Sequence, residues 1–380
     1  MVGQWFGSSY SNEFKTTTIT VMNIEPRSPE EGLLIGVSSP HQQRTIADAL
    51  IKVVGNTILG TTTKFQVYDQ AAKIVIPIDA FYKNNGWKEP PQEAEYKGDF
   101  DGTKITGTYK NNLNHTGHFT WWRTFSEAAY NGKLPPKPDS VTPMTWAEFK
   151  TSIVKFQQKG RFLFRGQHSN AFPLRTAFHR KQRNNLPLYL MHECSRLRHH
   201  INAISSHYYQ DTAEELHGLL SLAQHHGFPT PFLDWTLSPY VAAFFAFDCL
   251  TERSQWHEKK DRLPVRIFTF DLHAWHNVSR IWIQSLNDPC PDLQFIHPPA
   301  HNNPRYYPQQ SMAAFSSIDN IEDYIAAYEL DAKQQFLTRI DIHADERDRA
   351  EDELRFMGIT PASLFPGIEG VCKSLRAELF

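Results

Sequence analysis

The segment from Leu222 to Ala246 gathers more residues able to do chemistry than any other stretch of this chain. Gln224, two histidines and a glycine form a tight turn, and Asp234-Trp235-Thr236 follows after two prolines. An almost purely apolar run then extends from Pro239 to about Phe247, and it predicts a buried helix because no face of it is polar. A turn rich in His, Asp and Gln that leads into a buried helix is typical of the wall of a functional site.

Arg165 lies in the run Phe164-Arg165-Gly166-Gln167, at the end of a predicted strand. A planar guanidinium that is always charged suits a phosphate or a carboxylate, and Gly166 would let a ligand approach the backbone. The same arginine could instead form a structural ion pair with an aspartate such as Asp234. The residue types alone leave both alternatives open.

His225 and His226 are adjacent, so their side chains face different ways and do not converge on one metal ion. The chain has no HExxH motif and no Cys/His cluster with zinc spacing, so we expect no metal. One of the two histidines is expected to orient a partner by hydrogen bonding. Asp234 lies between apolar residues and is expected to be partly buried, either as a base or in a structural ion pair.

A second polar and aromatic segment runs from Arg305 to Phe315 and includes Tyr306 and Gln309. Its rings could stack on a base or a nicotinamide, or they could pack in the core, which is the alternative favoured for Phe315. Glu369 is expected at the start of the last helix, where the helix dipole favours a carboxylate. It is also the best-placed lone glutamate for chemistry.

Mixed α and β structure is expected around these residues. Thr145 and Glu148 predict a capping box, and Ser238 or Thr236 can cap the helix that begins at Pro239. Strands are expected at 161–165, 265–270 and 336–340, and helices at about 185–223, 239–247 and 345–357.

The first 125 residues predict an all-β domain. Short runs rich in β-branched residues, separated by turns, occur at 3–7, 16–22, 33–37, 57–61, 64–68, 104–109 and 118–123. Glycines inside strands suit the bends of a small barrel, and a sandwich is the alternative. Prolines between 132 and 139 predict a linker over 126–145. The expected fold class is therefore α+β, with an all-β accessory domain at 1–125 and a mixed domain at 146–380.

Composition sets wider limits on function. The 380 residues leave room for two domains, and the net charge of −2 argues against a surface that coats nucleic acid, although a local basic groove remains open. The four cysteines are far apart and form no CxxC pair, which is typical of reduced thiols. No signal peptide or membrane-spanning run is recognisable, so we expect a cytoplasmic protein. Kinase, P-loop, Rossmann and α/β-hydrolase motifs do not occur.

Several motifs resemble the FRG domain, which is named for its Phe-Arg-Gly motif. The resemblance extends from about residue 143 to 380 and rests on Trp146-Ala147-Glu148-Phe149, Phe164-Arg165-Gly166-Gln167, Ala223-Gln224-His225-His226-Gly227-Phe228-Pro229-Thr230, Leu233-Asp234-Trp235-Thr236, Arg305 with Gln309, and Leu364-Phe365-Pro366. This chain departs from the family at two places. Pro231-Phe232 replaces Arg-Leu before Leu-Asp-Trp, and residues 310–315 lack the family's Gln-x-Gly-x-Phe.

The family is distantly similar to ADP-ribosyltransferases, and this similarity implies NAD⁺ as a substrate. It implies that the cofactor contacts are Arg165, Gln167, His225, Thr236, Tyr306 and Gln309. The implied catalytic residues are Glu369, Asp234 and His226. A late glutamate would hold the ribose hydroxyl and stabilise an oxocarbenium-like transition state. Glu369 is preferred for this role over Glu351 and Glu353, which fall on a charged surface helix.

The resemblance therefore implies an ADP-ribosyltransferase, a kind of glycosyltransferase, that acts as a toxin or anti-phage effector. Its acceptor would be RNA, DNA or a host protein, and the β domain would recognise that target or a neutralising partner such as an antitoxin. One alternative is a binding module for a nucleotide or macromolecule without turnover. Another is a nuclease or hydrolase that uses Asp234 and His226. Removing the late carboxylate distinguishes an enzyme from a binder.

Overall fold

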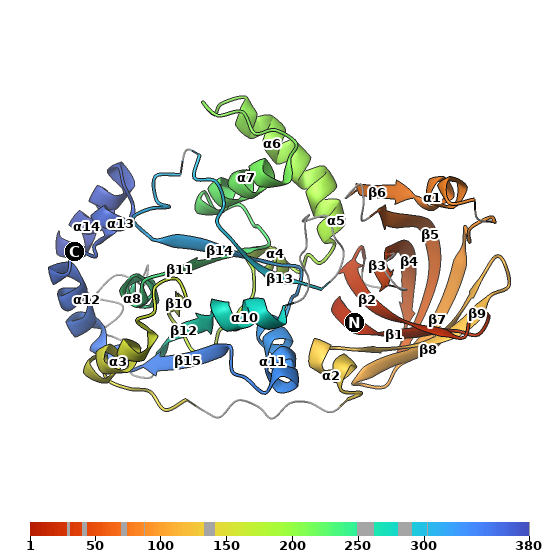
Figure 1. Ribbon diagram of the computed structural model, residues 1–380, viewed down its shortest axis with the longest axis horizontal. Coiled ribbons are helices and arrows are strands. Elements are labelled where there is room, and N and C mark those ends of the chain that lie inside the picture. Colours follow the sequence, from red (N-terminus) through yellow and green to blue (C-terminus); the bar gives the residue numbers. More distant parts are fainter. Residues whose placement is uncertain are drawn as a thin grey trace.

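The computed structural model describes residues 1–28, 31–39, 44–69, 74–86, 88–132, 141–248, 262–279, 291–301 and 303–379. An N-terminal β-barrel, at the right of Figure 1, is followed by an α+β region built on a second sheet. This is the predicted fold class, with a barrel rather than a sandwich. Cys249, Cys290 and the Pro-rich part of the predicted linker lie outside the described residues.

Eight antiparallel strands close the barrel, and the pairing of β4 with β5 completes the ring. The strands are β1 (Gly3–Ser11), β2 (Thr16–Pro26), β3 (Glu31–Ser39), β4 (Arg44–Val54), β5 (Thr57–Asp69), β7 (Ala94–Phe100), β8 (Lys104–Asn111) and β9 (Thr116–Trp122). A short strand, β6 (Ile74–Pro77), adds to β5 outside the ring and leads into α1 (Ile78–Asn84). The two strands predicted at 57–61 and 64–68 are one continuous strand, because β5 continues through the threonines between them.

The second sheet has six strands in the order β13-β14-β11-β10-β12-β15, and every neighbouring pair is antiparallel. Their bounds are β10 (Phe162–Gln167), β11 (Phe232–Thr236), β12 (Val265–Asp271), β13 (Leu293–Ile296), β14 (Ser311–Ser316) and β15 (Leu337–Ile342). Six residue pairs join β10 to β12, whereas β10 and β11 share only the pair Phe164–Thr236. The backbone pairing at the centre of the sheet is therefore much weaker between β10 and β11 than between β10 and β12.

Helices cover both faces of this sheet (Figure 1). On one face, α8 (Pro239–Phe247) packs with α3 (Trp146–Ser152), α12 (Arg347–Phe356) and α13 (Pro361–Leu364) in one hydrophobic cluster. On the other face lie α10 (Leu272–Val278) and α11 (Ile321–Ala332). The remaining helices are α2 (Phe125–Ala129), α4 (Ala177–Arg180), α5 (Leu186–Leu188), α6 (Cys194–Asn202), α7 (Ala213–His225) and α14 (Ile368–Leu379).

Local signals in the sequence explain two of these helices. The predicted capping box is present. The Thr145 hydroxyl accepts from the Glu148 N–H, and the Glu148 carboxylate accepts from the Thr145 N–H. Ser238, one of the two predicted caps, accepts from the Val241 N–H at the start of α8. The helix is buried along most of its length, as its all-apolar sequence predicts.

The barrel packs against the second sheet through β1 and β2. Gln4 donates to the Ser317 carbonyl at 2.9 Å and accepts from the Asp319 N–H at 3.1 Å, while Phe6 and Val21 join the core beneath that sheet. The predicted linker begins within a packed helix, because α2 places Phe125 against Tyr324 with ring centroids 4.7 Å apart. The boundaries at 125 and 145 stay a prediction. No helix in the described part of the chain has both the length and the apolar character needed to cross a bilayer.

Candidate functional site

Arg165 lies where β10 separates from β11. Its Nη1 donates to the backbone carbonyl of Asp234 at 2.5 Å, so the guanidinium links β10 to β11. Burial lowers the pKa of Arg165 to about 10; the Asp234 carboxylate opposes this shift and the nearby Arg180 cation adds to it. The Nε atom is buried and has no hydrogen-bond partner among the described residues. Arg165 is thus a charged donor that is only partly satisfied.

Gly166 serves packing rather than ligand approach, which corrects the expectation from the sequence. A Cβ at this position would lie 1.9 Å from the Ala242 carbonyl oxygen and 2.8 Å from the Ala246 nitrogen. Both atoms belong to the backbone of α8. The glycine is required because the helix crosses the strand at this point.

Asp234 differs from the expectation that it is partly buried, because its side chain is exposed. Side chains alternate along β11, so the neighbours Leu233 and Trp235 are buried in the core while Asp234 faces the other way. Its carboxylate accepts from the Gln224 amide at 2.6 Å, and Gln224 in turn accepts from the Thr230 hydroxyl. A neutral amide at the end of α7 therefore holds the carboxylate in place.

Arg305 joins the histidine turn to the last helix. It donates to the His225 carbonyl at 3.2 Å and forms an ion pair with Glu369, which also pairs with Lys373 at 3.2 Å. The hydrogen bond from Lys373, with the nearby Arg305, lowers the pKa of Glu369, so this carboxylate is ionised at neutral pH. Glu369 lies in the first turn of α14, as predicted.

The two histidines have different surroundings. Burial lowers the pKa of His225, while the nearby Asp234 carboxylate opposes the shift and the Arg305 cation adds to it. His225 thus lies between the Arg165–Asp234 contact and the Arg305–Glu369 pair. His226 is exposed and forms the C-cap of α7. Among the described residues no hydrogen bond joins His226 to Asp234, the pair considered for a nuclease or hydrolase.

Of the other four predicted cofactor contacts, three have protein partners and one, Gln167, has none in the described part of the chain. The Thr236 hydroxyl donates to the Gln309 carbonyl at 2.7 Å, and the Gln309 amide donates to the Leu364 carbonyl at 2.9 Å, so both side chains bind protein groups. The Tyr306 hydroxyl is 3.1 Å from His297. By contrast, Gln167 is only 6% exposed, and neither polar atom of its amide has a partner among the described residues. Phe315 is fully buried, as its core alternative predicted.

Arg180, at the end of α4, was missed by the sequence reasoning. Its charge lowers the pKa of Arg165, so the two guanidinium groups lie near each other. Burial and the neighbouring Arg175 cation lower the pKa of Arg180 itself. Arg175 is paired with Asp319, but in the described part of the chain no carboxylate pairs with Arg180. Two neighbouring cations without a shared anion are suited to binding a phosphate group.

Glu351 and Glu353 have structural partners. Glu351 pairs with Arg347 one turn away, and Glu353 accepts from the buried Trp146 indole at 3.0 Å and binds Lys150. Glu353 thereby fastens α12 to α3. These structural contacts account for both carboxylates, so neither glutamate needs a catalytic role to explain its presence.

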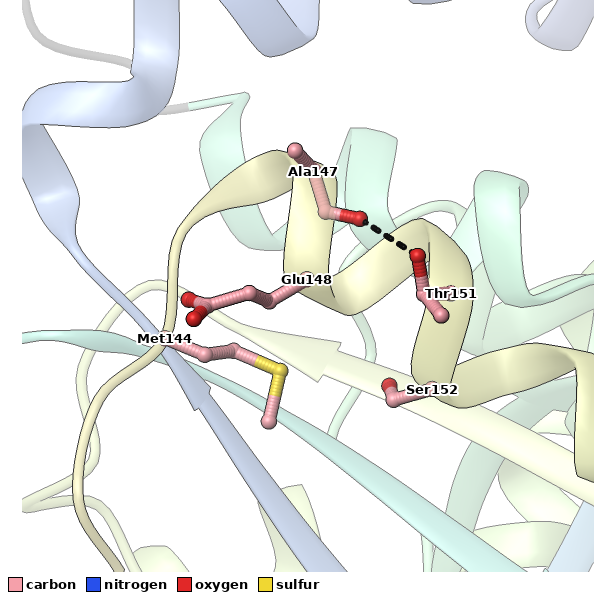
Figure 2. A pocket seen from close by; sticks show the side chains of 5 residues that line it. All are labelled: Met144, Ala147, Glu148, Thr151 and Ser152. Atoms are coloured by element: carbon pink, nitrogen blue, oxygen red, sulfur yellow. Dashed lines mark hydrogen bonds between the residues drawn. The ribbon is translucent and has the colours of Figure 1, made fainter.

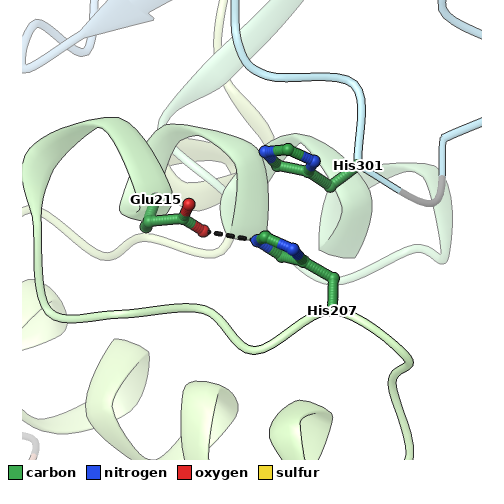
Figure 3. Close-up of side chains that lie close together, drawn as sticks. All are labelled: His207, Glu215 and His301. Carbon is green, nitrogen blue, oxygen red and sulfur yellow. Dashed lines mark hydrogen bonds and ion pairs between the residues drawn. The ribbon is translucent and has the colours of Figure 1, made fainter.

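One group of potential metal ligands occurs among the described residues. His207, Glu215 and His301 have donor atoms within 4.8 Å of one another (Figure 3). His207 Nε2 is 2.7 Å from Glu215, but the His207 and His301 rings are stacked, with centroids 3.9 Å apart and planes at 13°. A histidine binds a metal in the plane of its ring, so two stacked parallel rings do not direct their nitrogens at one ion. The group is arranged as a hydrogen-bonded stack.

A separate hollow of about 490 Å³ lies beside the start of α3 (Figure 2). Met144, Ala147, Glu148, Thr151 and Ser152 line it. Glu148 is engaged in the capping box, and the Thr151 hydroxyl donates to the Ala147 carbonyl at 3.2 Å. The lining groups thus stabilise the helix, and this hollow contains none of the residues predicted to bind the cofactor or to act in catalysis.

The candidate site is therefore the junction of β10 and β11, where Arg165 reaches the Asp234 carbonyl beside the polar turn at the end of α7. The family model of the FRG domain matches residues 160–255, so this region carries an FRG domain, as the motifs predicted. The match spans β10, α4 to α8 and β11, and thus includes Arg165, Arg180, the histidine turn and Asp234.

Comparison with other proteins adds the following findings. No curated protein matches this chain. A redesigned β-barrel, mFAP1, bound to DFHBI is 13% identical, with coverage of 32% of this chain and 94% of its own and a TM-score of 0.24. A second redesigned β-barrel, b11L5F_LGL, is 11% identical, with coverage of 32% and 90% and a TM-score of 0.24.

Proposed function

We propose that the FRG region binds NAD⁺ as a substrate and transfers its ADP-ribosyl group to an acceptor. The observation that carries this proposal is the guanidinium of Arg165, which reaches from β10 to the Asp234 carbonyl on β11 and on which the charge of Arg180 acts. Arg165 has a buried Nε without a partner, and the nearby strand residue Gln167 has an unpartnered amide. These unsatisfied donors fit a ligand that supplies oxygen acceptors and negative charge, as a diphosphate does.

The two arginines would bind the diphosphate in different ways. Arg165 is held by the Asp234 carbonyl, so its guanidinium is already oriented before a ligand arrives. Arg180 is exposed and free of carboxylate partners in the described residues, so it can close on a phosphate from the solvent side. A preoriented cation loses less conformational entropy on binding than a mobile one.

Glu369 is our candidate for the catalytic carboxylate. In the transfer, the bond between the ribose C1′ and the nicotinamide nitrogen breaks and its electron pair leaves with nicotinamide. The acceptor then bonds to C1′ and loses a proton. Positive charge builds up on the ribose between these events, and an ionised carboxylate stabilises it. The ion pairs with Arg305 and Lys373 keep Glu369 ionised, which supports this role.

A binding module without turnover is the second candidate, and one observation favours it. Both candidate catalytic carboxylates have protein partners: Gln224 holds Asp234, and two cations hold Glu369. A carboxylate that must first release its partners is a weaker catalytic group. On either function we expect a toxin or defence effector in the cytoplasm, with a nucleic acid or a protein as the acceptor or partner.

The test is incubation of the full chain with radiolabelled NAD⁺ and, separately, RNA, DNA and lysate protein. Arg165→Lys should weaken NAD⁺ binding roughly ten- to a hundredfold, because one charged hydrogen bond contributes about 1.5–3 kcal/mol and an ammonium cannot reproduce the fork. Arg180→Gln should also weaken binding. The matched control is Lys181→Gln, which removes an exposed charge beside Arg180 and should have no effect.

Glu369→Gln then separates the two candidates. Retained NAD⁺ binding with lost transfer identifies the catalytic carboxylate, whereas full transfer by this variant eliminates that assignment. Wild-type binding by a well-folded Arg165→Lys variant would contradict the proposed site as a whole. NAD⁺ binding by the wild type without transfer to any acceptor would favour the binding module.

A further inference from the structure

The β-barrel has a partly open pocket of about 860 Å³, well separated in sequence from the FRG region, and charged side chains such as Lys52, Glu95 and Lys97 are part of its lining. Its wall includes Ile51, Tyr96 and Tyr109, which belong to or pack against the hydrophobic core of the barrel. Pockets that hold small organic molecules usually have volumes of about 300–1,000 Å³ and often lie in β-barrels. The cavity is therefore large enough for a ligand.

The strand register explains why this space is empty of side chains. Successive partners around the barrel run Gly117–Tyr109, Tyr109–Tyr96, Tyr96–Gly60, Gly60–Ile51 and Ile51–Gly32, so the row has glycine at three of its six positions. A Cβ at Gly60 would meet Ile51 at 3.3 Å and Tyr96 at 3.5 Å, which shows that this position faces inward. An eight-stranded barrel is just wide enough either to be filled by side chains or to hold one small ligand.

The wall of the cavity has a definite chemistry. The Tyr96 and Tyr109 rings lie 6.2 Å apart, and Tyr96 lies 6.4 Å from Phe119, which stacks on Trp121. The Tyr96 hydroxyl accepts from Thr62 at 3.2 Å, which leaves its own proton available for donation. Burial raises the pKa of Tyr96, so the hydroxyl stays neutral and remains a donor at physiological pH. Aromatic rings prefer offset or edge contacts with other rings.

We propose that this cavity is a binding site for a small planar aromatic molecule that carries a hydrogen-bond acceptor. The ring would pack against Tyr96, Tyr109 and Ile51, and the acceptor would receive the Tyr96 proton. The site is independent of the function proposed for the FRG region, since it shares no residue with it.

The test uses 1-anilinonaphthalene-8-sulfonate, an aromatic probe with an acceptor group, and the full chain. Wild-type protein should show a saturable rise in probe fluorescence with one site per chain. Gly60→Leu adds a side chain within the cavity and should weaken binding by about tenfold or more, because a filled cavity excludes the probe. The matched control is Lys64→Gln on the same strand, an exposed residue that does not line the pocket, and the change should leave affinity unaltered.

Two milder variants keep the test decisive if Gly60→Leu does not fold. Gly60→Ala adds one carbon and should weaken binding by a smaller factor, and Tyr96→Phe removes the donor and should weaken binding severalfold. Circular dichroism and the melting temperature establish which variants are folded. The proposal is overturned if the wild type shows no saturable binding, or if the folded Gly60 and Tyr96 variants bind as tightly as Lys64→Gln.

Discussion

Replacing Gly166 by alanine should destabilise the FRG region severely, because α8 leaves no room for a Cβ. The added carbon would lie 1.9 Å from the Ala242 oxygen, while ordinary contacts begin near 3.4 Å, so the helix would have to retreat by about 1.5 Å. Ala242, Ala246 and Phe247 are fully buried, so this retreat would loosen the packing along α8. Overpacking commonly costs about 1–3 kcal/mol and more where backbone must move. We expect a loss of about 3 kcal/mol, roughly a hundredfold in the folding equilibrium.

Urea unfolding of the full chain, followed by circular dichroism, measures this loss. Gly60→Ala is the matched control, since its nearest contact would be a side-chain carbon at 3.3 Å and its backbone angle is ordinary. The control should change the free energy of unfolding by no more than about 1 kcal/mol. A Gly166→Ala variant as stable as the wild type, but unable to bind NAD⁺, would refute the packing argument and return Gly166 to the ligand.

Three further predictions concern stability. Burial lowers the pKa of His179 to about 4, so as the pH falls from 6.5 to 4 only the unfolded chain gains this proton, and His179 by itself lowers the free energy of unfolding by about 1.4 kcal/mol per pH unit. Burial also lowers the pKa of His217 to about 4, so His179→Gln should reduce the total slope by this amount in urea titrations at several pH values, and an unchanged slope would contradict the argument. Glu353→Ala leaves the buried Trp146 indole N–H unpaired and should cost about 1–3 kcal/mol in a thermal melt without changing NAD⁺ binding; lost binding in a folded variant would contradict this. Glu25→Ala removes the carboxylate that accepts from the backbone N–H groups of Asn184 and Asn185, at 2.6 and 2.7 Å, so these two amides should exchange with deuterium faster; unchanged exchange would show that the contact is not maintained in solution.

Strands with a regular pattern were predictable, and those whose pattern is disturbed were not. β4 was missed because its apolar residues Ala49, Leu50 and Ile51 follow one another without alternation, next to a register shift in which Thr63 of β5 has no Cα partner on β4. β14 was missed because it is buried on both faces, so its sequence does not alternate. α8 was predictable because its cap and its uniformly apolar composition are both local signals.

The site shows the same division between local and tertiary information. The polar turn and Arg165 could be recognised as motifs, and the position of Glu369 in the first helical turn follows from local chemistry. Nothing near Arg180 in the sequence reveals its proximity to Arg165. Thr236 was assigned to the cofactor from the family resemblance, and its partner in the structure, the Gln309 carbonyl 73 residues away, leaves no sequence signal.

Only one residue pair joins β10 to β11, so the second sheet consists of two parts that are weakly connected by backbone hydrogen bonds. Five pairs hold β11 to β14 and six hold β10 to β12, so each half is more firmly bonded internally than to the other. The guanidinium of Arg165 bridges the gap in place of the missing backbone hydrogen bonds. An anion that draws this guanidinium away from the Asp234 carbonyl would remove the bridge, so binding and the separation of the halves are thermodynamically linked. A covalent link between β10 and β11, such as an engineered disulfide, would accordingly change the affinity for the anion even though the link does not contact the anion.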